Sequence, residues 1–178
     1  MSKLPAPTHE RLRKALASGN LPEDPAEPGY NDVYDIYGEL WESLAGAWER
    51  SGESPARRHV SALIDVWSAI PTDGLLVGVA VNQPEVVAAA IEAARFMKLK
   101  TCAELLARIH ECIPGEVSSR SEPTSRHEWY DGGKKGRKLA AQLEELEGIA
   151  QDGEFGTELL EACFRRVLAE PAEFFERV

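Results

Sequence analysis

Apolar side chains recur at intervals of three and four residues along most of the chain, which places them on one face of an α-helix. Between residues 31 and 48 this pattern predicts a long amphipathic helix. Its apolar positions are Val33, Ile36, Tyr37, Leu40, Trp41, Leu44, Ala47 and Trp48. Ser54-Pro55 combines an N-cap residue with proline at the first helical position, so a second helix should begin there.

The second helix is expected to bury one apolar side, after which Pro71 should end it. That side comprises Val60, Leu63, Ile64, Trp67 and Ile70. The apolar run LLVGVAV at 75–81 is predicted as a short buried helix, because a single strand would have no partner. An alanine-rich helix should follow at 85–97. Trp41, Trp48 and Trp67 are all expected in the core.

Thr101 and Glu104 have the spacing of a capping box, so we predict that Thr101 caps the next helix. The last helices are expected at 137–151 and 157–169, with one or two further turns after Pro171. The expected fold class is therefore all-α, a single compact domain of about six or seven helices with a short N-terminal helix and a long surface loop.

A segment that contains proline and glycine separates the helical domain from the N-terminal helix. The segment NLPEDPAEPG at 20–29 is predicted to be a linker, because proline lacks the amide donor that a helix needs. Residues 1–29 thus form an N-terminal helix, expected at 8–18 and loosely attached, plus a proline- and acid-rich linker. Residues 30–178 form the helical domain, in which 114–136 is an irregular loop rich in Ser, Pro and Gly.

The net charge of −10 makes direct binding to nucleic acid or to an anionic membrane unfavourable and favours basic partners. The three cysteines have no C-x-x-C spacing, which is typical of small buried side chains in a reducing compartment. The N-terminal residues contain no apolar run resembling a signal peptide, and no apolar run is long enough to span a bilayer. A cytoplasmic location is therefore expected.

Sequence motifs for catalysis and cofactor binding are absent. DGGKKGRK at 131–138 lacks the spacing of a phosphate-binding loop and follows no predicted strand. The four histidines form neither an H-E-x-x-H pattern nor the Glu-x-x-His pairs of di-iron bundles. We therefore expect no catalytic residue, no metal and no cofactor.

The segment YNDVYDIYGELWESL at 30–44 carries four acids and no base. At about 100° per residue, Asp32, Asp35, Glu39 and Glu42 fall within roughly 80° of one another on a helix. The apolar residues lie largely on the opposite side, so the four carboxylates should form a stripe pointing away from the core. This placement excludes a buried metal cage or a desolvated acid–base pair.

Negative charge is segregated along the chain. Residues 23–53 hold nine acids against Arg50 alone, and residues 139–161 hold seven acids and no base. Same-sign helix faces are less common than mixed ones, because neighbouring carboxylates repel. We therefore predict an acidic surface that binds a basic protein, with these partner-binding residues: Asp32, Asp35, Glu39, Glu42, Glu144, Glu145, Glu147, Glu154 and Glu158. A solvated surface without a partner is the simpler alternative.

The order of features from residue 55 onward is SALIDVW, TDGLLVGVAVNQPE, AAIEAARFMKLKTCAELLARI, a long loop, and two acidic helices ending in PAEFFERV. Over residues 55–178 the chain resembles the bacterial family of all-helical DNA-mimic proteins of about nineteen kilodaltons. The resemblance implies an all-helical fold, a homodimer, no catalytic centre and an acidic face presented to a DNA-binding transcription regulator.

An alternative function belongs to a different class. Polar residues flank the glycine-containing apolar segment, so a small-ligand-binding or enzymatic helical domain would have its pocket near Asp73, Asn82 and His110. A structure that encloses no polar cavity at that place would exclude this alternative.

Overall fold

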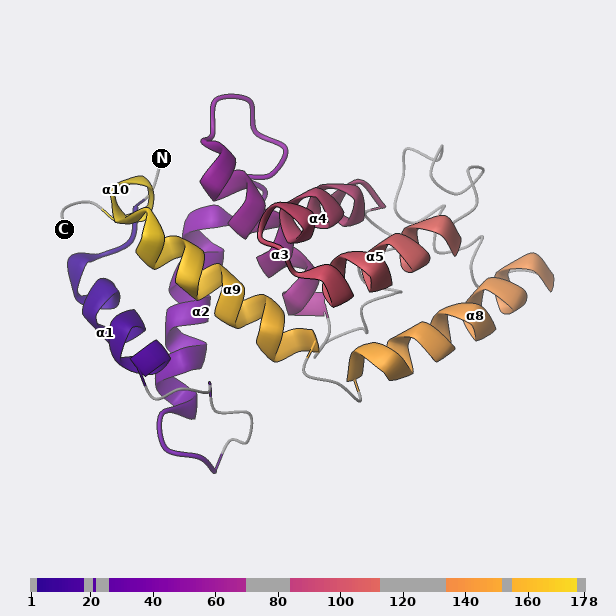
Figure 1. Ribbon diagram of the computed structural model, residues 1–178, viewed down its shortest axis with the longest axis horizontal. Coiled ribbons are helices and arrows are strands. Elements are labelled where there is room, and N and C mark those ends of the chain that lie inside the picture. Colours follow the sequence, from indigo (N-terminus) through magenta and orange to yellow (C-terminus); the bar gives the residue numbers. More distant parts are fainter. Residues whose placement is uncertain are drawn as a thin grey trace. The chain divides into compact units, whose positions relative to one another are not determined.

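The computed structural model describes residues 3–17, 21, 26–69, 84–112, 134–151 and 155–175. Within these ranges the secondary structure is entirely helical apart from one isolated bridge between Leu4 and Phe175, so the all-α prediction is confirmed. Eight helices are present in them (Figure 1): α1 (Ala6–Ala17), α2 (Tyr30–Leu44), α3 (Pro55–Ala69), α4 (Pro84–Phe96), α5 (Lys100–Cys112), α8 (Lys134–Gln151), α9 (Phe155–Ala169) and α10 (Pro171–Phe174).

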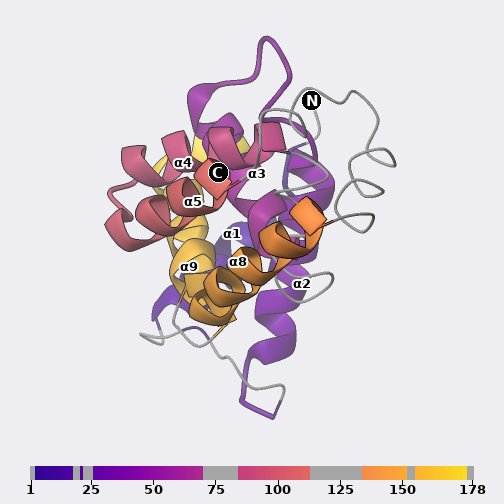
Figure 2. The ribbon, with the colours of Figure 1, turned by 90° about the vertical axis from the view of Figure 1, so that its right-hand side faces the viewer.

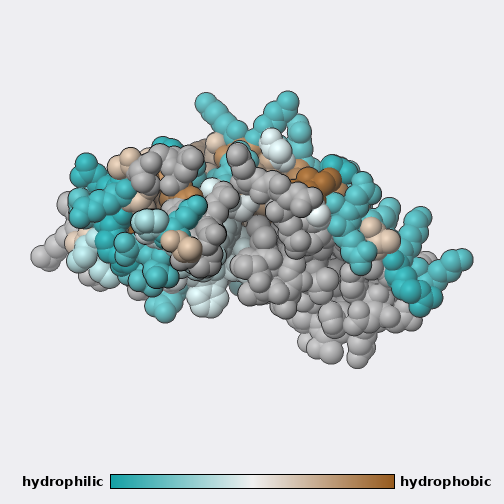
Figure 3. Space-filling model, turned by 90° about the horizontal axis from the view of Figure 1, so that it is seen from below, coloured by the Kyte–Doolittle hydropathy of each residue, from teal (hydrophilic) through white to brown (hydrophobic). Residues whose placement is uncertain are grey.

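The chain divides into two compact units. Unit 1 comprises Met1–Ile64 and Thr157–Val178, and unit 2 comprises Asp65–Gly156. Each unit has its own apolar interior. Unit 1 buries residues of α1, α2, the first part of α3, α9 and α10, whereas unit 2 buries residues of α4, α5 and the end of α3. The face drawn in Figure 3 is mostly hydrophilic where its residues are described, as expected for the polar sides of amphipathic helices.

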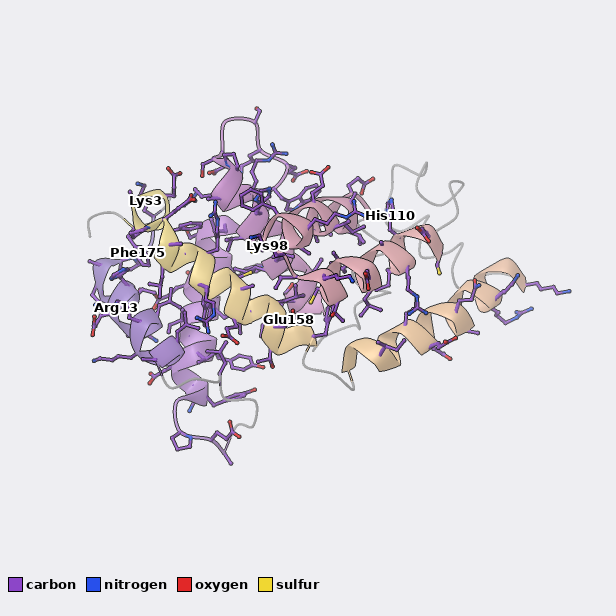
Figure 4. The ribbon with its side chains drawn as sticks, viewed as in Figure 1. Lys3, Arg13, Lys98, His110, Glu158 and Phe175 are labelled. Atoms are coloured by element: carbon purple, nitrogen blue, oxygen red, sulfur yellow. The ribbon has the colours of Figure 1, made fainter. Side chains whose placement is uncertain are left out.

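In unit 1 the N-terminal segment is held against both α2 and the C-terminus. Leu4 and Leu12 are 1% and 0% exposed, and α1 lies alongside α2. The backbone amide of Leu4 donates to the Phe174 carbonyl at 2.7 Å, and Lys3 Nζ donates to the Ala172 carbonyl at 2.6 Å. Lys3 and Phe175 accordingly lie close together in Figure 4. The expectation that the N-terminal helix is loosely attached is wrong, because Leu12 of the helix and Leu4, just before it, belong to the core.

Helix α2 ends at Leu44, four residues earlier than its apolar periodicity predicts. The backbone leaves the helical conformation at Ala45, whose ψ is 123°. The Ala47 amide then donates to the Leu44 carbonyl at 2.8 Å, across a turn in which Gly46 adopts φ 65°, a left-handed conformation that suits glycine. Ala47 remains fully buried although it lies outside the helix, so the apolar pattern continues through a turn. Helix α3 begins at Pro55 as predicted, and Ser54 Oγ accepts a hydrogen bond from the Arg57 amide at 3.4 Å.

Arg57 is a buried cation at the centre of unit 1. Its Nε donates to Glu53 Oε2 at 2.8 Å, and the two side chains are only 3% and 2% exposed. The guanidinium also donates to the carbonyls of Ser43 and Glu173, at 3.3 and 3.2 Å, and lies 6.0 Å from the centre of the Phe174 ring. One side chain thus connects the end of α2, the start of α3 and α10.

In unit 2, α5 packs against both α4 and α8, and Figures 1 and 2 show α4 and α5 side by side. Lys98 adopts φ 64° in the turn between α4 and α5, and the Leu99 amide donates to the Ala94 carbonyl at 2.9 Å. Helix α5 begins at Lys100, so Thr101 lies inside its first turn and the predicted cap at Thr101 is wrong.

The predicted loop at 114–136 overlaps the start of α8, which begins at Lys134. The rest of that loop, Ile70 and the predicted helix at 75–81 lie outside the described residues. No helix in the described part of the chain is long and apolar enough to cross a membrane.

Candidate functional site: the acidic stripe of helix α2

The acidic stripe comprises Asp32, Asp35, Glu39 and Glu42 of α2. Asp32, Asp35 and Glu42 are exposed, as predicted from their helical phase. Glu39 is half-buried, with its side chain 32% exposed. The prediction is that all four carboxylates point away from the core, and Glu39 differs from the other three because its carboxylate lies against Arg11 and Thr8 of α1. Helix α1, which the helical phase of α2 could not reveal, covers this position.

Arg11 of α1 supplies a countercharge to the acidic stripe. Its Nη1 lies 2.8 Å from Glu39 Oε1, and its Nη2 lies 3.6 Å from Asp35 Oδ2. Nη2 also donates to the Asp32 carbonyl at 3.5 Å, and the Thr8 hydroxyl donates to the second oxygen of Glu39. Residues 23–53 contain a single base, but the fold brings another from residue 11. The local charge of the stripe falls from four negative charges to three.

The remaining negative charge lies on the solvent side. The Asp35 side chain is 71% exposed, and its ion pair within the described ranges is the longer contact to Arg11. Neither Asp32 nor Glu42 has a side-chain ion pair with any residue that the structure describes. These three carboxylates are available to a partner, whereas Glu39 is already committed to α1.

A second feature of α2 is a row of aromatic side chains, the aromatic row Tyr30, Tyr34, Tyr37 and Trp41. The rings of Tyr30 and Tyr34 lie 4.4 Å apart between centroids, and those of Tyr34 and Tyr37 lie 6.5 Å apart. Burial, a hydrogen bond with Tyr30 and the charges of both neighbouring phenols raise the pKa of Tyr34 to about 12.

The aromatic row was missed from the sequence, although its i, i+4, i+7, i+11 spacing is visible there. Trp41 is 43% exposed, so its expected place in the core is wrong, and Trp48 is only half-buried, whereas Trp67 is buried. At about 100° per residue the row lies roughly 150° from the acidic stripe. The two features therefore occupy different faces of α2.

The second predicted acidic set is divided between the two units. Glu144 and Glu145 are exposed on α8, in unit 2, and the backbone of Glu147 belongs to the same helix. Glu158 is half-buried on α9, in unit 1, and Glu154 lies outside the described residues. The α2 stripe is therefore the acidic surface whose local geometry is defined most fully.

Of the three residues predicted near the alternative pocket, the structure describes one, His110. His110 is exposed at the C-terminal end of α5, and Asp73 and Asn82 lie outside the described residues. Among the residues that the structure describes, no three His, Cys, Asp or Glu side chains are grouped so that they could hold a metal ion.

Comparisons with protein-family models, with curated proteins and with solved structures return no significant match. The resemblance to the DNA-mimic family therefore stays a prediction from the sequence.

Proposed function

We propose that this protein is a non-enzymatic interaction protein whose acidic stripe on α2 binds a basic protein. The observation that carries the proposal is the state of the carboxylates. Asp32, Asp35 and Glu42 are exposed on one helix face, and among the described residues the cation paired with that face is Arg11, which lies 3.6 Å from Asp35. Such a face attracts a basic surface through electrostatic complementarity, which increases the association rate and weakens with salt.

The contact between α1 and α2 supports the chemistry of this proposal. Asp35 and Glu39 already hold the guanidinium of Arg11 between them, with hydrogen bonds and ion pairs of 2.8 to 3.6 Å. Arginine suits such a site because its planar guanidinium offers several donors in fixed directions. A partner that presents arginines would use the same kind of contact at Asp32, Asp35 and Glu42.

A DNA-binding protein, such as a transcription regulator, is the proposed class of partner. Its DNA-binding surface must be basic, because most of the affinity for DNA comes from phosphate contacts. A row of carboxylates presents charges of the same sign to that surface. The acidic protein and duplex DNA would then compete for the DNA-binding surface of the regulator. Binding of the acidic protein would therefore reduce the amount of regulator bound to DNA.

The test compares capture of basic proteins by the wild-type chain and by the triple variant Asp32→Lys/Asp35→Lys/Glu42→Lys. Glu39 is left intact, because it holds α1. We expect the wild type to retain a basic DNA-binding protein at low salt and the triple variant to lose it. Duplex DNA added to the purified complex should displace the acidic protein, as measured by fluorescence anisotropy.

Glu92→Lys is the matched control, because Glu92 is an exposed acid on α4 and lies outside the acidic stripe. Capture should be unchanged in this variant. Two outcomes would overturn the proposal: the triple variant binds the recovered partner as tightly as the wild type, or DNA and the acidic protein bind that partner simultaneously. Circular dichroism of each variant confirms that the helices are intact.

A further inference from the structure

A hollow of about 460 Å³ lies in unit 2 beside the turn between α4 and α5. We call it the basic hollow and define it by its lining residues: Arg95, Lys98, Lys100, Ala103, Glu104 and Ala107. Figure 4 shows Lys98 at this turn and His110 at the opposite end of α5. His110 is not among the described residues that line the basic hollow, and those that do line it belong to unit 2.

The shape of the basic hollow follows from two alanines. Lys100, Ala103, Glu104 and Ala107 are spaced i, i+3, i+4 and i+7, so they share one face of α5. Ala103 and Ala107 end in methyl groups, which leave the space above them unfilled and make this part of the lining apolar. Larger side chains at the same positions would fill the space.

The charge of the basic hollow is opposite to that of the whole chain. Residues 93–103 contain three bases, Arg95, Lys98 and Lys100, and no acid. All three bases are exposed and all three line the hollow. Glu104 is the acid in the lining, and it lies 3.8 Å from Lys100 Nζ. Three cations against one carboxylate leave a local excess of two positive charges in a chain whose net charge is −10.

The helix geometry adds to this positive potential. Lys100, the first residue of α5, lines the hollow, so the N-terminal end of the α5 dipole lies beside it. Lys98 adopts a left-handed conformation in the short turn that joins α4 to α5. This tight turn brings Arg95, Lys98 and Lys100 together at the hollow. The hollow thus combines an apolar floor with a cationic rim.

We propose that the basic hollow binds a small organic anion, a phosphate or carboxylate attached to an apolar body. Arg95, Lys98 and Lys100 would hold the anionic group, and the methyl groups of Ala103 and Ala107 would contact the apolar body. This site requires a ligand of the opposite charge to the basic partner of α2. Its failure would therefore leave the proposed function of the acidic stripe untouched.

Phenyl phosphate is the probe, because it joins both chemical features in one small molecule. Inorganic phosphate tests the anion alone and phenol tests the apolar body alone, while benzoate separates a carboxylate from a phosphate. Binding is followed by amide chemical shifts in ¹H–¹⁵N correlation spectra of the full chain. We expect saturable shifts in residues 95–107 with phenyl phosphate or benzoate, and weaker binding of phosphate and phenol. An affinity in the millimolar range suits a probe of this size.

Two variants test the charge and the space independently. Lys98→Gln removes one cation, and we expect the affinity to fall about tenfold, the effect of one lost charge-assisted hydrogen bond. Ala107→Leu keeps every charge but places a larger side chain in the apolar part of the lining, and it should weaken binding of phenyl phosphate. Arg108→Gln is the matched control, since Arg108 is an exposed base on the same helix but does not line the hollow. Its affinity should stay within about twofold of the wild-type value.

Three results would overturn this proposal. The first is the absence of saturable shifts in residues 95–107 with either phenyl phosphate or benzoate. The second is equal weakening by Lys98→Gln and Arg108→Gln, which would indicate only a general electrostatic effect. The third is unchanged binding in Ala107→Leu, which would place the probe outside the hollow.

Discussion

Arg11 Nη1 lies 2.8 Å from Glu39 Oε1, which joins the N-terminal helix to the middle of the acidic stripe. The two residues are separated by 28 positions in sequence, so neither local helix pattern reveals the contact. Both side chains are about one-third exposed, at 33% and 32%. The pair therefore combines a structural role in unit 1 with a position on the proposed binding face.

Replacing Arg11 with alanine should lower the free energy of unfolding by about 1 kcal/mol, because the half-buried Glu39 loses a charged donor. Urea denaturation measures this change. Arg13→Ala is the control, because Arg13 is an exposed base on the same helix whose ion pair, among the residues described, is with Glu10 at 3.6 Å. Arg13→Ala should lower the free energy of unfolding by less than about 0.5 kcal/mol. Equal losses in the two variants would contradict a specific role for Arg11.

Glu53→Gln should be much more destabilising, with a loss of about 3–5 kcal/mol, because it removes the carboxylate that lies 2.8 Å from the buried Arg57 Nε. The double variant Glu53→Gln/Arg57→Met removes both charges and should lose less stability than the sum of the single variants. Urea denaturation of the wild type, the two single variants Glu53→Gln and Arg57→Met, and the double variant gives the four free energies of unfolding that a double-mutant cycle needs. Additive losses would show that the two side chains stabilise unit 1 independently.

Lys98→Gly should raise the free energy of unfolding by about 1 kcal/mol, because glycine adopts the left-handed conformation at φ 64° without steric cost. Arg108→Gly, inside α5, should have the opposite effect of about −1 kcal/mol. Thermal denaturation distinguishes the two signs. Because Lys98 is one of the three cations proposed to hold the anion, Lys98→Gly should also bind phenyl phosphate more weakly than the wild type.

Tyr34 predicts a specific loss of stability at alkaline pH. Its pKa rises from 10.0 to about 12 in the folded protein, so between these values the unfolded chain binds fewer protons at this residue than the native state. The contribution is complete below pH 10 and is lost as the pH rises toward 12. Tyr34→Phe should remove it, so the difference in Tm between pH 9 and pH 11 should be smaller in the variant. An unchanged difference would contradict this assignment.

The α2–α3 region shows how far local patterns determine the fold. The positions of Val33, Ile36, Leu40 and Leu44 predict a helix with one buried face, and all four residues are buried. Ser54-Pro55 likewise marks the start of α3, because a cap and a proline act within one turn. The end of α2 was predicted too late. Ala47 is buried in the turn, so its apolar character does not distinguish a helix from a tightly packed turn.

The candidate site required more than local patterns. Helical phase correctly exposes Asp32, Asp35 and Glu42, because it depends only on residue spacing. It cannot place Arg11 beside Glu39, since that contact depends on how α1 packs against α2. The basic hollow is similar: the three bases between 93 and 103 are visible in the sequence, but their arrangement around Ala103 and Ala107 requires the turn at Lys98.

The sequence by itself therefore determined the all-α class, the buried apolar face at Val33, Ile36, Leu40 and Leu44 of α2, and the segregation of charge along the chain, because these properties depend on residue type and spacing within a few turns. Only the tertiary structure decided which charges meet. Arg11 offsets the acidic stripe from 28 residues away, and Arg57 donates to the carbonyl of Glu173, 116 residues away. Such contacts depend on the packing of distant elements, where burial and desolvation, rather than sequence proximity, determine the outcome.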